Sequence, residues 1–263
     1  MIAIGRRRVS IHWMKNISKL IIVLMAAGFI TPVVMTVGMS VYEDGAITWQ
    51  GYKDLFFDCF VFYRLFWNSV LYSCAITVFQ LIVNILGAFG LRFAKFRGRG
   101  LLFLLYLVLM MMPLQVMILP NYLGLRDMNL IDTGFAIILP MIFSPLGLVV
   151  LYQYTNGIDP EIIEAARLET NSMGRIIVSA LLPQIRICIF AVGLFIFAEA
   201  WGLVEQPMLF LRREELKTLT IFLSETEKYS SNVLLPASVI YIIPVLLLYM
   251  FFHEELEEGL KFI

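Results

Sequence analysis

Residues able to do chemistry are few and poorly grouped in this chain of 263 residues. The cysteines Cys59, Cys74 and Cys188 lack the paired spacing of a zinc or redox site. We therefore expect them to be small buried apolar residues with no metal or redox role. The run His253–Glu255 lacks the second histidine that a zinc protease needs, and no GxxxxGK[ST] loop is present to cradle nucleotide phosphates. We therefore expect no catalytic residue, no metal site and no cofactor bound by this chain.

Polar side chains in or beside apolar stretches are the remaining candidates. Asn84 and Glu199 each lie in a long apolar run, and Glu205 and Gln206 follow the second of these runs. A carboxylate inside a membrane span costs about 2.5–3.5 kcal/mol on insertion scales, so it should face protein or water. Glu199 either hydrogen-bonds to a neighbour such as Asn84 or Gln80, or accepts hydrogen bonds from the hydroxyls of a solute. We expect these residues to mark a translocation path or an external gate: Asn84, Glu199, Glu205 and Gln206.

One polar stretch, residues 159–183, separates two apolar runs. Asp159 can cap free backbone N–H groups, and Pro160 suits the first helical position, where no N–H is needed. The helix should end near Thr170 or Asn171. Because β-branched Thr170 fits the left-handed region badly, we expect Asn171 to take positive φ. A second short helix should follow, giving a helix-turn-helix that is too polar to sit in lipid.

The first of these two helices is expected to be amphipathic. Three apolar residues are spaced to share one face: Ile162, Ala165 and Ala166. Three charged residues leave that face: Glu161, Glu164 and Arg167. Isolated helices below about 12–15 residues are marginal in water, so this helix needs a partner surface. The two alanines are small enough to let the backbone approach that surface closely.

Composition places most of the chain in lipid. Hydrophobic residues make up 60% and charged residues 15%, the mean hydropathy is +0.85, and the formal net charge is zero. Zero net charge implies no bulk attraction to nucleic acid. Six apolar runs are each about long enough to cross a hydrocarbon core of about 30 Å. They are Leu20–Val41, Leu65–Leu91, Leu101–Leu125, Thr133–Ile158, Ile187–Val204 and Val233–Phe252. We predict an all-α polytopic membrane protein with an N-terminal segment 1–19, a transmembrane domain 20–252 and a C-terminal tail 253–263.

The polar stretch 159–183 resembles the EAA loop of binding-protein-dependent ABC importer permeases. The matching residues are Glu164-Ala165-Ala166, Glu169, Ser172, Ile176 and Leu182-Pro183. Thr170 replaces the family's glycine, and Ile187 stands where a proline often occurs. In that family the loop docks on a cytoplasmic ATPase. The resemblance therefore implies a coupling role for Glu161, Glu164, Ala165, Ala166, Arg167, Glu169, Thr170 and Asn171.

A longer resemblance links the chain to the carbohydrate branch of these permeases. Its pieces are Asn68-Ser69, Met112-Pro113, Pro120–Leu123, Leu130–Thr133, Ile138–Pro140 and Glu258–Leu260. It implies a MetI-like fold with six transmembrane helices that imports a sugar or oligosaccharide by alternating access. It also implies a second permease subunit in a heterodimer, two ATPase subunits that hold ATP and Mg, and an extracytoplasmic solute-binding protein.

Other classes of function remain open from the sequence. A stand-alone channel or secondary transporter would work without an ATPase. A permease of the same family could carry a solute other than a sugar. A membrane-embedded enzyme would need paired catalytic residues at matched depth, and Glu199 is the one acidic residue of its apolar run.

Lysine and arginine are distributed unevenly between the segments that join the six runs. If the N-terminus is cytoplasmic, 13 of the 20 basic residues fall in cytoplasmic segments and 7 in external ones. Because cytoplasmic segments carry the excess of Lys and Arg, this predicts that both termini and residues 159–183 are cytoplasmic in a multi-pass protein of the cell membrane.

This orientation can be tested with single cysteines placed at Arg97 and Asp44 in a background that lacks the three native cysteines. A membrane-impermeant maleimide should label Asp44→Cys from outside intact cells and Arg97→Cys only after the cells are opened. Labelling of both positions from the same side would contradict the orientation.

Overall fold

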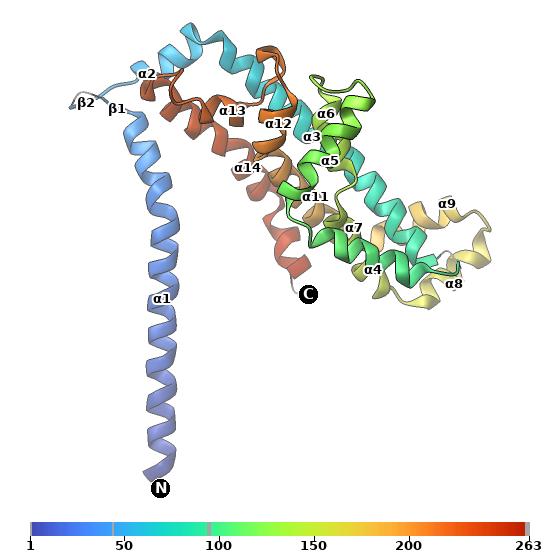
Figure 1. The fold of residues 1–263 in the computed structure, drawn as a ribbon. Coiled ribbons are helices and arrows are strands. Elements are labelled where there is room, and N and C mark those ends of the chain that lie inside the picture. The colour runs from blue at the N-terminus through green and yellow to red at the C-terminus, as the bar shows by residue number, and fades with distance from the viewer. Residues whose placement is uncertain (1, 44, 94–95, 261–263) are drawn as a thin grey trace. The chain divides into compact units, whose positions relative to one another are not determined.

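The computed structural model describes residues 2–43, 45–93 and 96–260 (Figure 1). Most of this part of the chain is helical, as predicted. A two-stranded hairpin of β1 (Tyr42–Glu43) and β2 (Ala46–Ile47) was not predicted. The longest helices are α1 (Ile2–Ser40), α3 (Phe60–Phe93) and α14 (Ser231–Leu260). Between α1 and α8 the shorter helices are α2 (Gln50–Lys53), a π-helix (Asp54–Asp58), α4 (Arg99–Met110), α5 (Leu114–Asp127), α6 (Phe135–Ile142) and α7 (Pro145–Asn156). The later elements are α8 (Pro160–Glu169), α9 (Met173–Ile176), a π-helix (Ile177–Leu181), α10 (Leu182–Gln184), α11 (Arg186–Trp201), α12 (Glu205–Phe210), a 3₁₀ turn (Glu214–Leu216) and α13 (Leu219–Ser224).

Helix length and apolarity agree with the six predicted spans. Four stretches are long and apolar enough to cross a membrane: Lys19–Ser40, Phe60–Phe93, Phe135–Asn156 and Ser231–Glu254. Two bent helix pairs pass the same test, α4 with α5 at 106° and residues 173–184 with α11 at 81°. Counting each bent pair as one span gives six.

Prolines explain where the middle spans break. Pro113 is extended, with φ −66° and ψ 144°, and it separates α4 from α5. A proline lacks the N–H of a helical residue and pushes the preceding residue out of helical conformation, so α4 cannot continue past Met112. In the fourth span, extended Ser144 precedes Pro145, which occupies the first turn of α7.

The chain divides into two compact units. The first consists of residues 1–60 and 226–241. In this unit Gly51 of α2 lies so close to the carbonyl oxygen of Asn232 in α14 that a Cβ atom there would overlap it. Ser40 at the end of α1 lies 2.9 Å from the hydroxyl of Tyr52, measured between the two side-chain oxygens. These contacts hold α2 against the end of α1 and the start of α14.

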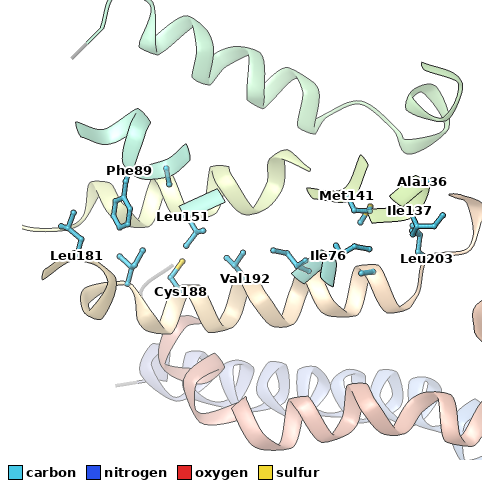
Figure 2. Packing of buried hydrophobic residues seen from close by; sticks show 14 of the residues in the cluster. Ile76, Phe89, Ala136, Ile137, Met141, Leu151, Leu181, Cys188, Val192 and Leu203 are labelled. Atoms are coloured by element: carbon cyan, nitrogen blue, oxygen red, sulfur yellow. The ribbon is translucent and has the colours of Figure 1, made fainter. Parts of the chain in front are cut away.

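The second unit consists of residues 61–225 and 242–263 and contains the main apolar core. Figure 2 shows this core as a row of side chains between α11 and the α6–α7 pair. Phe89 and Leu181 lie at one end of the row, and Ile137 and Leu203 lie at the other. Figure 1 shows α8 and α9 near the C-terminal end of α3, with α12 and α13 far from them along the same helix. The row therefore spans the distance between these two sets of short helices.

Close packing within this core depends on a glycine. Asn84 of α3 is 1% exposed. A Cβ atom on Gly147 of α7 would overlap the Nδ2 atom of Asn84 and lie 3.2 Å from a methyl group of Val192 in α11. The missing side chain at position 147 is therefore what lets three helices meet around a buried amide.

We expect Gly147→Ala to destabilise the folded protein by about 1–3 kcal/mol, the usual cost of overpacking. Thermal unfolding in detergent measures this effect. Gly90→Ala is the matched control, since no atom lies within 4 Å of a Cβ at that position. Combining Gly147→Ala with Asn84→Ala should recover part of the loss, and a fully additive loss would show that the two residues do not compete for space.

Candidate functional site

The helix expected at residues 160–169 is present as α8, and its start is as predicted. Asp159 is extended, with φ −61° and ψ 126°, and its carboxylate accepts the backbone N–H of Glu161 at 3.0 Å. Pro160 takes the first helical position. This cap fixes where the chain turns from the end of α7 into α8.

The two faces of α8 differ from the prediction at one residue. The inner face packs against the core through Ile162, Ile163 and Ala166. Ala165 was expected on this face, but it is exposed. In a helix of 3.6 residues per turn, Ala165 lies about 40° from Glu161 and about 60° from Leu168, and so on their side of the helix. The outer face is therefore made by Glu161, Glu164, Ala165 and Leu168, all of them exposed.

Leu168 is the largest apolar side chain on this outer face, and it is 91% exposed. Sequence reasoning missed it because apolar spacing alone does not show which apolar residue is left without a neighbour. Glu164 and Arg167 are exposed one turn apart and form no ion pair with a residue in the described ranges. The outer face thus presents charged groups around an uncovered leucine.

The turn after α8 contradicts the prediction for Asn171. Among non-glycine residues in the described part of the chain, positive φ occurs at Asn129 and Asp132. The helix instead ends on Thr170 in an extended conformation, with φ −154° and ψ 142°. The Oγ1 atom of Thr170 accepts the N–H of Ser172 at 3.2 Å, so a side chain closes the turn and no left-handed residue is needed.

The segment after this turn is anchored in the core. The second short helix was predicted and is present as α9, a π-helix and α10 in succession. Ile176, Leu181 and Ile185 are at most 2% exposed and belong to the main core. Helix α8 also contacts α9 and the π-helix, so the segment folds back along α8. Residues 159–183 are therefore a compact projection with a fixed inner side, while Glu169 and Asn171 are exposed.

The polar residues expected on a path lie in different environments. Asn84 and Gln80 are each 1% exposed on α3, whereas Glu199 is exposed on α11. The hydrogen bond considered between Glu199 and Asn84 or Gln80 does not form, and Glu199 has no hydrogen bond to any residue that the structure describes. The residues that the structure describes thus leave Glu199 exposed, and a carboxylate within a membrane span is costly in contact with lipid.

The remaining two path candidates lie on α12. The Nε2 atom of Gln115 in α5 donates to the Oε1 atom of Glu205 at 3.0 Å. Gln206 is 1% exposed. Sequence reasoning did not find Gln115, because its contact joins residues that are 90 positions apart.

A second polar site, also not predicted from the sequence, holds the loop that follows α12. Asp132 has φ 62°, and its Oδ1 atom accepts the backbone N–H groups of Arg212 and Arg213, each at 2.9 Å. Its Oδ2 atom accepts Nε of Arg213 at 3.0 Å. The α3 side of this loop is held by Asn68, which donates to the carbonyl oxygens of Glu215 and Lys217.

These contacts set the titration of the Asp132 carboxylate. The backbone N–H of Arg213 lowers its pKa most, desolvation opposes this, and the N–H of Arg212 and the Arg213 guanidinium lower it further. Because the pKa of Asp132 is lowered in the folded state, the contact stabilises the loop at pH values above the ordinary pKa of an aspartate. That stabilisation is lost as pH falls through the lowered pKa.

The family pattern described as binding-protein-dependent transport system inner membrane component matches residues 83–261. The chain belongs to that family. Membership makes it a membrane transport component, not an enzyme, and removes the stand-alone channel and the membrane enzyme from consideration. The matched residues run from the last part of α3 through α14 and include residues 159–183, α12 and Asp132.

Curated relatives extend the similarity over most of the chain. The arabinooligosaccharide transport system permease of Bacillus subtilis is 29% identical over 230 residues, which cover 86% of this chain and 82% of the relative. The sn-glycerol-3-phosphate transport system permease of Brucella abortus is 28% identical over 202 residues, which cover 75% of this chain and 72% of the relative.

Solved structures support the fold. A chain from a bacterial ABC transporter that imports the acidic polysaccharide alginate superposes with a TM-score of 0.81 at 20% identity, covering 93% of this chain and 97% of that one. A second structure of the alginate transporter, in complex with its pentasaccharide-bound periplasmic protein, gives a TM-score of 0.74 at 13% identity.

We expect Asp132→Ala to loosen the loop at residues 211–217. It removes an acceptor that holds two backbone N–H groups and one guanidinium, and a hydrogen bond to a charged group contributes about 1.5–3 kcal/mol. Trypsin at pH 8 should then cleave after Arg212 or Arg213 about tenfold faster or more, since cleavage needs local opening. Asp127→Ala is the control, because Asp127 pairs with the exposed side chain of its neighbour Arg126. Equal cleavage rates for both variants and the parent protein would show that Asp132 does not hold this loop.

Proposed function

We propose that this chain is a transmembrane permease subunit of an ATP-driven importer of a sugar or oligosaccharide, and that residues 159–183 couple it to separate ATPase subunits. Family membership supports the transport role. The arabinooligosaccharide permease and the alginate transporter support a carbohydrate solute. In this assembly ATP and Mg belong to the ATPase subunits, and this chain supplies half of the path together with a second permease subunit.

The observation that carries the coupling proposal is the two-sided construction of α8. Its inner face is packed into the core through Ile163, which is 8% exposed, while Leu168 on the outer face is 91% exposed. An exposed leucine on a cytoplasmic projection of a membrane protein contacts water unless another protein covers it. Fully burying such a side chain stabilises a complex by about 1.5–3 kcal/mol. The small side chain of Ala165 beside it leaves room for the partner's surface.

The geometry of the second unit supports a route for the motion. Ile176, Leu181 and Ile185 attach the projection to one end of the apolar row, and Leu203 and Phe210 lie at its other end near α12. ATP-driven closure of the ATPase subunits would move α8, and the packed row would carry that displacement along α11 to α12. We further propose that both termini and residues 159–183 lie in the cytoplasm, which the distribution of Lys and Arg supports. An external solute-binding protein then delivers solute to the opposite side.

Three substitutions on the outer face of α8 test this coupling. Ala165→Trp adds bulk where docking needs close approach, so ATPase subunits should be lost on purification while the permease still inserts. Leu168→Ala should weaken ATPase binding about tenfold, as expected from losing part of a buried leucine. Glu164→Lys should retain more of the bound ATPase subunits than Ala165→Trp does. It reverses the charge at the contact, however, so ATP hydrolysis should no longer respond to the solute-binding protein.

Affinity purification of a tagged permease, with subunit ratios measured by native mass spectrometry, gives the outcome. Leu71→Ala is the matched control, since Leu71 is an apolar residue of α3 that is 63% exposed. If all three variants assemble in normal ratio and transport at the original rate, residues 159–183 are not the coupling element.

A further inference from the structure

Helix α12 lies along the first turns of α5. At one end Glu205 accepts a hydrogen bond from Gln115, and at the other the rings of Phe210 and Tyr122 lie with centroids 6.1 Å apart. Gln206 is four residues before Phe210, so the two side chains leave the same side of α12. Glu205 therefore lies at the boundary between α12 and α5, and Gln206 follows it in the same turn of α12. We call Glu205 and Gln206 the α5–α12 seam, and Gln115 braces it from α5.

The seam contains more hydrogen-bond acceptors than donors. The Nε2 group of Gln115 is used by the Oε1 atom of Glu205. The Oε2 atom of Glu205 and the Oε1 atom of Gln206 are both buried, and neither has a hydrogen-bond partner among the residues that the structure describes. A buried polar atom without a partner costs about 1–3 kcal/mol. Two such acceptors side by side in the chain favour a ligand that donates hydrogen bonds.

The charge around the seam narrows the class of ligand. Residues 187–211, from the second residue of α11 to the residue after α12, contain no Lys or Arg, and their acidic residues are Glu199 and Glu205. In sequence, the nearest basic residues beyond this stretch are Arg186, which starts α11, and Arg212, an exposed residue beyond the end of α12. Arg213 pairs with Asp132, and Arg126 of α5 pairs with Asp127. An anionic group at the seam would meet the carboxylate charge of Glu205, and residues 187–211 supply no cation to balance it.

We propose that the α5–α12 seam binds hydroxyl groups of the transported solute through Glu205 and Gln206, and that it selects neutral polyhydroxylated solutes over anionic ones. This rests on the proposed import function. It assigns a direct solute contact to this subunit. Hydroxyl groups supply the donors that the two unpartnered oxygens lack, and a neutral sugar brings no charge that the carboxylates would repel. Glu199, exposed on the preceding helix, extends the acidic surface along the path.

The test compares uptake of labelled probes by cells that express the complete transporter. The neutral probes are arabinotriose and maltotriose, and the anionic probes are trigalacturonate and sn-glycerol 3-phosphate. The wild type should take up at least one neutral probe in preference to both anionic ones. Glu205→Gln should lower neutral uptake about tenfold, since a hydrogen bond to a charged group contributes roughly that factor. Gln206→Leu removes a neutral hydrogen bond and should lower it about fivefold. Glu205→Gln should also reduce the preference for the neutral probe.

Two controls separate solute contact from a purely structural role. Gln115→Leu breaks the hydrogen bond between α5 and α12 but keeps both acceptors, so the ratio of neutral to anionic uptake should stay within about twofold. Glu215→Gln removes a carboxylate from the exposed loop after α12 and should change nothing. If Gln115→Leu shifts the ratio as much as Glu205→Gln does, the seam only braces the two helices and the proposal is wrong.

The remaining outcomes also decide the matter. Preferred uptake of an anionic probe, or uptake of no neutral probe, overturns the proposal. Uptake that requires Na⁺ and fails in choline, with unchanged selectivity in Glu205→Gln, would assign the oxygens to a cation. Failure of ATPase subunits to co-purify with the wild-type chain would overturn the proposed import function. Normal assembly together with unaltered uptake by Glu205→Gln and Gln206→Leu would overturn the solute contact alone.

Discussion

The second unit depends on the row of apolar side chains that packs α11 against α6 and α7. Leu181 and Ile185 at one end of the row are completely buried, as is Phe210 at the other. Protein interiors of this kind are close-packed and deform little, so they transmit displacement instead of absorbing it. Gly147 shows how tight the packing is, since even one carbon atom there would overlap Asn84. The short helices at the two ends of the row are in this sense attached to one stiff body.

Polar groups in the second unit fall into two sets that differ in how well they are satisfied. Asn68, Ser69 and Asp132 have partners that lie far along the chain, and together they hold the segment from Arg212 to Leu219 in place. Gln80, Asn84 and Gln206 are more deeply buried than Asn68 and Asp132, yet each has a side-chain atom without a partner in the described residues. In a low-dielectric bundle the first set fixes one arrangement of the chain, whereas the second set retains capacity for further hydrogen bonds.

Much of the architecture could be predicted from the sequence because lipid allows few solutions. Long apolar runs must be helices, and Asp159 with Pro160 starts a helix through local contacts alone. Predictions failed where contacts between distant residues, or small angular differences around a helix, determine the backbone conformation or the exposed face. Asn129 is left-handed because the N–H of Leu130 reaches back to the carbonyl of Leu125, whereas Thr170 uses its own side chain and leaves Asn171 unstrained. In a ten-residue helix the 3.6-residue period does not settle a face to within one residue, so Ala165 was misplaced.

The separation of the two faces of α8 has a consequence for how such subunits can diversify. The inner side chains, including Ile163, take part in the core and cannot change without repacking it. The outer ones, Glu161, Glu164, Ala165 and Leu168, touch little of their own chain and are free to vary independently of the fold. Under the proposed coupling role, ATPase recognition and the fold of this chain depend on different residues of one short helix. Under that role, exchanging these four side chains would direct the same membrane domain to different ATPase subunits. Helix α8 is therefore a natural site at which to build chimeric transporters.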